Sequence, residues 1–140
     1  MPVSLTRTVA FHAWHRYWRP DWTPAENHAA FGALAEPPGH DHHYRCAVTV
    51  TGPLDPTMTM VLDLPLLDRI LADEVVKPLD GAHIDRDVPE FAPGRALPTC
   101  EALAQWLFSR IARRLPAGVA LQRVRVAEDD TLHADCTGHD

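Results

Sequence analysis

Two histidines, His40 and His42, stand one residue apart at the start of a segment with β-type composition. Side chains alternate between the two faces of a strand, so both imidazoles would point the same way, roughly 6–7 Å apart along the backbone. Three histidines with a fourth position left open are a common catalytic zinc arrangement. The pair therefore predicts two ligands of a metal site, and the third must come from elsewhere in the chain.

His15 is our candidate for the third ligand because it ends a strand-like segment and would share a face with Ala13 and Phe11. His12 is the competitor and would lie on the opposite face if the extended form persists. Spacing alone leaves both open, and it also leaves open that the histidine pair belongs to a polar loop without a metal.

Hydrophobic periodicity and capping residues predict alternating strands and helices. Thr23 precedes Pro24 at one expected helix start, and Asp63 is expected to cap another. We expect strands at 3–11 (continuing to His15), 44–51, 120–126 and 132–136, an extended segment at 58–62, helices at about 24–34, 64–77 and 99–115, and a polar loop at 79–91. This order predicts a single α+β domain over residues 1–140, with helices on one face of an antiparallel sheet.

Composition excludes several classes of protein. The chain has 140 residues and a formal net charge of −6, with no block of Lys or Arg, so we expect no nucleic-acid partner. No apolar run approaches the ~20 residues of a membrane span, and no signal peptide is recognised at the N-terminus. Three widely spaced cysteines predict reduced thiols and a cytoplasmic location.

Further motifs follow in order along the chain. They are Phe11-x-Ala13-x-His15, Pro38-Gly39-His40-x-His42-x-Tyr44, Gly52-x-x-Asp55-Pro56, Pro98-Thr99-x-Glu101 and Val124-x-Val126-x-Glu128. Together they resemble the 6-pyruvoyl-tetrahydropterin synthase / 6-carboxytetrahydropterin synthase family, and the resemblance covers nearly the whole chain.

The resemblance implies a tunnelling fold (T-fold): a four-stranded antiparallel sheet with two helices on one face, whose subunits form a β-barrel, commonly a homohexamer built as a dimer of trimers. It implies a zinc-dependent lyase acting on 7,8-dihydroneopterin triphosphate or a related pterin. The implied zinc ligands are His15, His40 and His42. The implied substrate-binding residues are Glu128, Thr99 and Glu101, although Thr99 is also well suited to be a plain helix N-cap.

The chain departs from the family where a base is expected. Leu34 stands where the family has a catalytic cysteine, and Gly81 where it has a relay histidine. We expect Glu36 to serve as the base, with Asp80 and His83 handling protons. Their alternatives are a solvated loop residue for Glu36 and a backbone-bonding loop residue for Asp80. The alternative functions are a recruited enzyme with a non-pterin, zinc-chelating substrate, and a pterin-binding homologue without catalysis.

Overall fold

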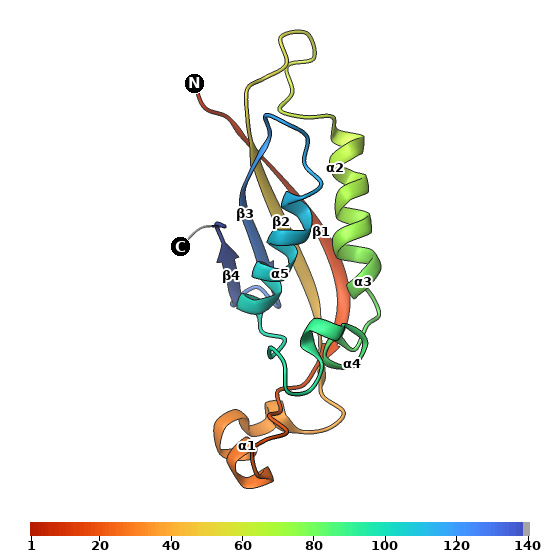
Figure 1. Ribbon diagram of the computed structural model, residues 1–140, viewed down its shortest axis with the longest axis vertical. Helices are drawn as coiled ribbons and strands as arrows, with labels where there is room; N and C mark the ends of the chain where they lie inside the picture. Colours follow the sequence, from red (N-terminus) through yellow and green to blue (C-terminus); the bar gives the residue numbers. More distant parts are fainter. Residues whose placement is uncertain (139–140) are drawn as a thin grey trace.

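A four-stranded antiparallel sheet is the centre of the fold in the computed structural model, which describes residues 1–138. The strands follow chain order, β1-β2-β3-β4, so that β1 and β4 form the edges (Figure 1). Their bounds are Ser4–His15 for β1, His40–Thr51 for β2, Ala120–Ala127 for β3 and His133–Cys136 for β4. The predicted antiparallel sheet is confirmed, and β2 includes both histidines of the pair.

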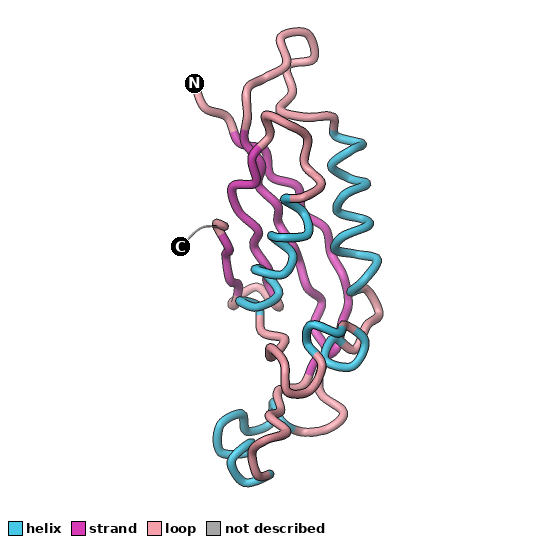
Figure 2. Tube along the Cα trace, in the orientation of Figure 1, coloured by secondary structure: helices cyan, strands magenta, loops and turns pink. Residues whose placement is uncertain are grey.

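Two helical segments cover one face of this sheet (Figures 1 and 2). The first runs from α2 (Leu64–Leu71) through a π-helical turn at Ala72–Val76 into α3 (Lys77–Leu79), and the second is α5 (Cys100–Ala112). Two shorter helices, α1 (Pro24–Phe31) and α4 (Ile84–Asp87), lie toward the end of the sheet where the histidines are. The predicted placement of helices on one face is confirmed.

Pro78 explains a contact between the two long helical segments. Proline has no N–H, so the carbonyl of Glu74, four residues earlier, loses its usual helical donor. Arg110 of α5 donates to that carbonyl at 3.3 Å from its Nε and also contacts the Glu74 carboxylate at 3.3 Å from its Nη2. The side chain of Arg110 thereby ties α5 to the helix beside it.

The core lies between the sheet and these helices. Alternate residues of β2 point into it, whereas the residues between them face the uncovered side of the sheet. The fully buried hydrophobic side chains include Tyr44, Val48, Val50, Leu67, Ile70, Leu71, Leu103, Leu107 and Ile111. Within residues 1–138 the helices are too short or too polar to cross a membrane.

Some local predictions were wrong. The expected extended segment at 58–62 is not a strand. It begins with the last residue of a turn at 56–58, where the Asp55 carboxylate accepts hydrogen bonds from the backbone of Thr57 and Met58, and it continues as loop. Asp63 precedes α2 but its side chain makes no capping bond. The helix expected to reach residue 34 ends at Phe31 and is followed by a 3₁₀ turn at Gly32–Ala35. The expected loop at 79–91 contains α4 and a 3₁₀ turn at Pro89–Phe91.

Candidate metal centre

Strand register brings the three predicted histidines together. β1 and β2 pair antiparallel, with His15 directly opposite His40 and Ala13 opposite His42. Residues opposite each other in such a pair point to the same face, and so do residues two apart on one strand. His15, His40 and His42 therefore share the face that the helices cover, at the end of the sheet.

The ligand atoms of these histidines converge. The Nε2 atoms of His15 and His40 are 2.8 Å apart, and one ligand atom from each of the three rings lies within 4.8 Å of the others. Nitrogen ligands around a tetrahedral zinc lie about 3.3 Å apart. Small side-chain movements would bring the rings to that spacing. The Nε2 atom of His42 is buried and has no hydrogen-bond partner, so a metal would satisfy it.

His15 is held in the form that a metal requires. Its Nδ1 donates to the carbonyl of Pro98 at 2.8 Å, which leaves the lone pair of Nε2 facing His40. Its side chain is almost completely buried, and this burial lowers the pKa of His15 to about 4, assisted by the neighbouring histidines and opposed by the bond to Pro98. The ring is therefore neutral near pH 7 and able to bind a cation.

Glu128 lies beside the histidine cluster at the end of β3. Its Oε2 is 3.5 Å from Nε2 of His42, and its side chain is only 13% exposed. The thiol of Cys100, at the start of α5, points at the same carboxylate with Sγ 3.8 Å from Oε2. His42 and Glu128 also line one open cleft together with Asp129. The remaining residues that line this cleft are also polar: Asp41, His43, Arg45 and Asp130.

Two cysteines, Cys46 and Cys100, are buried, and neither is suited to act as a base. Burial, together with the nearby carboxylates of Glu128 and Glu101, raises the pKa of Cys100 to about 12. Burial alone raises the pKa of Cys46 to about 12. Both thiols therefore stay protonated near neutral pH, and neither can act as the base.

His12, the competing third ligand, lies on the other face of the sheet. It is opposite His43 in the register, and the two rings stack with their centroids 4.6 Å apart. Its Nε2 is 2.7 Å from the carboxylate of Asp41. Because the sheet separates this group from the cluster, the geometry favours His15 over His12.

Thr99 and Glu101 lie at the start of α5. The hydroxyl of Thr99 accepts a hydrogen bond from the backbone N–H of Ala102 at 3.1 Å, so this residue is an N-cap. Glu101 is exposed in the first turn of the helix. The carbonyl just before the cap is that of Pro98, which holds His15, so the start of α5 reaches the metal centre. The substrate-binding roles of Thr99 and Glu101 stay predictions.

The three residues expected to handle protons have their side chains engaged elsewhere. Glu36 is exposed and lies 3.4 Å from the ring of His28. Asp80 accepts a hydrogen bond from the backbone N–H of His12 at 2.9 Å. Nε2 of His83 donates to the carbonyl of Pro38 at 2.5 Å. Their catalytic roles stay predictions.

Sequence reasoning missed Asp85 and the carbonyl of Pro98. Asp85 lies 3.3 Å from Nδ1 of His83 and accepts from the backbone N–H of Arg16, next to His15. The only sequence signal for Asp85 was its place in a polar loop two residues after His83.

Comparison with known proteins agrees with this geometry. Residues 4–139 match the family model described as 6-pyruvoyl tetrahydropterin synthase. The human 6-pyruvoyl tetrahydrobiopterin synthase is 36% identical over 128 residues, covering 91% of this chain and 86% of the human one. The structure of Caenorhabditis elegans 6-pyruvoyl tetrahydropterin synthase has a TM-score of 0.91 at 27% identity, covering 99% of this chain and 97% of that one. The Plasmodium vivax enzyme, at 12% identity with a TM-score of 0.68 and 97% of each chain covered, shares the fold.

Proposed function

Because the chain belongs to the 6-pyruvoyl tetrahydropterin synthase family and has its T-fold, we propose that it is a zinc-dependent lyase acting on 7,8-dihydroneopterin triphosphate or a related pterin. One observation carries the proposal: His15, His40 and His42 converge beside the buried carboxylate of Glu128. The first group suits a metal, and the second suits the edge of a pterin ring.

His15, His40 and His42 would hold the zinc, with Pro98 orienting the ring of His15. A zinc ion held by these residues would supply Lewis-acid chemistry. Glu128 would accept two parallel N–H groups from the amino-pyrimidine edge of the pterin. These two interactions would fix the ring and its side chain relative to each other, which is how positioning contributes to rate.

The proposed base, Glu36, is exposed at the surface. Glu36 would have to leave His28 before it could accept a proton from substrate. This observation favours one alternative, in which the protein binds a pterin without converting it.

Turnover can be tested directly. Zinc-loaded protein is incubated with 7,8-dihydroneopterin triphosphate, and products are followed by mass spectrometry. We expect release of triphosphate or acetaldehyde, and we expect Glu36→Gln to abolish it because an amide cannot accept the proton. Tight binding without product would support the non-catalytic alternative. Unchanged turnover in Glu36→Gln would show that Glu36 is not the base.

We also propose that the chain assembles into a homohexamer, a dimer of trimers in which sheets join into a barrel. The edge strands β1 and β4 leave backbone donors and acceptors available over part of their lengths, and such edges are suited to pairing with another copy. Light scattering should give the mass of six 15.6 kDa chains. A mass equal to one chain at micromolar concentration would contradict this assembly.

A further inference from the structure

We propose that Asp85 and His83 form a positioning pair that keeps His15 and His40 in place relative to each other. This inference rests on the proposed zinc site. The pair connects the chain on both sides of the cluster. Asp85 Oδ1 accepts from the backbone N–H of Arg16 at 2.9 Å and lies 3.3 Å from His83 Nδ1. Nε2 of His83 is 2.5 Å from the carbonyl oxygen of Pro38.

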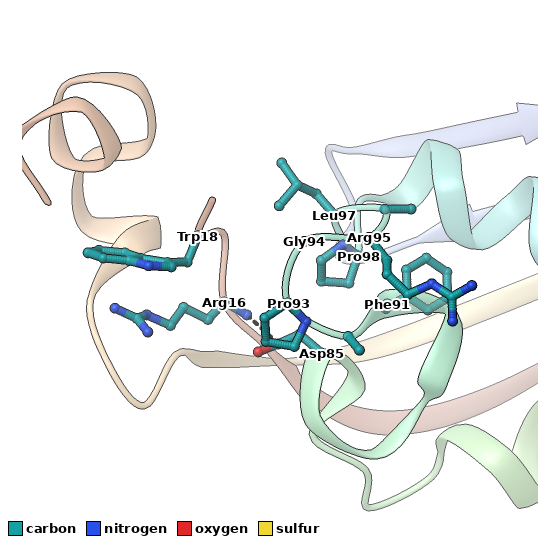
Figure 3. A pocket seen from close by; sticks show the side chains of 11 residues that line it. Arg16, Trp18, Asp85, Phe91, Pro93, Gly94, Arg95, Leu97 and Pro98 are labelled. Carbon is teal, nitrogen blue, oxygen red and sulfur yellow. Dashed lines mark hydrogen bonds between the residues drawn. The ribbon is translucent and has the colours of Figure 1, made fainter. Parts of the chain in front are cut away.

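The two anchored positions are neighbours of metal ligands. Arg16 follows His15 at the end of β1, and Pro38 stands two residues before His40. The pair therefore links the end of β1 to the loop that leads into β2. Figure 3 shows Asp85 beside Arg16, with Pro98 lining the same pocket. Pro98 also supplies the carbonyl that orients His15, so one residue of this pocket contacts a proposed metal ligand.

The ring of His83 contacts a different group on each side. A carbonyl can only accept, so Nε2 carries the hydrogen that binds Pro38. On the other side, Nδ1 faces the carboxylate of Asp85. The side chains of His83 and Asp85 are only 11% and 21% exposed, so water weakens their attraction less than it would at the surface.

The loop before β2 packs closely against the end of β1, so a movement of this loop would change the contact between them. Gly39 has a φ of 109°, and a Cβ added there would lie 2.4 Å from the carbonyl oxygen of His15. The side chain of Arg16 also connects the end of β1 to this loop, because its Nε donates a hydrogen bond to the carbonyl of Ala35 at 2.6 Å. A shift of this loop would therefore move His40 relative to His15, whose Nε2 atoms are only 2.8 Å apart.

Asp80 makes a different contact, although it comes from the same stretch of chain. Its carboxylate accepts a hydrogen bond from the backbone N–H of His12, three residues before His15. The partner of His83 is thus Asp85, and the role that these contacts indicate for the pair is to orient ligands.

The experiment measures zinc affinity by competition with a chelator, together with the absorption spectrum of the Co²⁺-substituted protein. We expect Asp85→Ala and His83→Ala to weaken zinc binding roughly 10- to 100-fold, the effect typical of residues that support metal ligands. The Co²⁺ spectrum should change while far-ultraviolet circular dichroism does not. Asp85→Asn keeps an acceptor for Arg16 and should lose less affinity than Asp85→Ala. If the alanine variants do not fold, weaker zinc binding by Asp85→Asn supports the inference, and wild-type affinity contradicts it.

Asp68→Ala is the matched control. It removes a carboxylate of α2 that contacts Arg7 of β1, away from the histidines. Its zinc affinity should equal that of the wild type. Wild-type affinity in the folded Asp85 and His83 variants would overturn this inference and leave the proposed zinc site standing. A wild-type protein that binds no zinc would overturn both.

Discussion

His40→Ala and His42→Ala should each abolish stoichiometric zinc binding, and activity should be lost with the metal. Each change removes one of three convergent nitrogens. Structural zinc sites provide about 10–16 kcal/mol of apparent binding free energy, so losing one ligand of three costs roughly 3 kcal/mol or more, about 100-fold or more in affinity. Metal content measured by elemental mass spectrometry after dialysis, and chelator competition, would report the loss.

His12→Ala is the matched control for this prediction. His12 lies on β1, as His15 does, but it stacks on His43 on the opposite face of the sheet. Its removal should leave zinc content unchanged. If His12→Ala lost zinc and His40→Ala kept it, the assignment of ligands would be wrong.

Adding zinc should also raise the melting temperature of the wild type but not of His40→Ala, because a ligand that binds only the folded state stabilises it.

The strands that contain the ligands could be predicted because their side chains alternate. Tyr44, Val48 and Val50 repeat at period two and are buried, and the same period places His40 and His42 on one face. Spacing along β2 could not decide between His12 and His15. That choice depends on how β1 pairs with β2, and a slip of one residue would exchange the two faces. In the sequence, His15 was favoured by its place at the end of the strand-like segment and by the family resemblance.

Contacts between distant segments account for what sequence reasoning missed. His83 meets Pro38 across 45 residues, and His15 meets Pro98 across 83. Neither contact leaves a periodic pattern, and both use a backbone carbonyl, which every residue has. Asp55 shows the same problem at short range: the residues after it look extended, but its side chain bonds the backbone and makes a turn.

Glu128→Ala should weaken pterin binding roughly 100-fold and leave zinc content unchanged. A carboxylate offers two acceptors to two parallel N–H groups, and each hydrogen bond to a charged group contributes about 1.5–3 kcal/mol. Glu128 is mostly buried, so water cannot fully replace it. Because its carboxylate lies 3.5 Å from His42, zinc content must be measured in the same variant, to separate loss of pterin from loss of metal.

Glu128→Gln sharpens this prediction because it keeps the size of the side chain. One oxygen of the carboxylate becomes an NH₂ group, which would face an N–H of the pterin, so two donors would meet without an acceptor. We therefore expect the Glu128→Gln variant to bind a non-reactive dihydropterin about as weakly as the Glu128→Ala variant does. Fluorescence titration measures both affinities. Asp68→Asn is the control, since Asp68 lies on α2, contacts Arg7 and does not line the cleft beside Glu128. Wild-type pterin affinity in Glu128→Gln would show that this carboxylate does not anchor the ring.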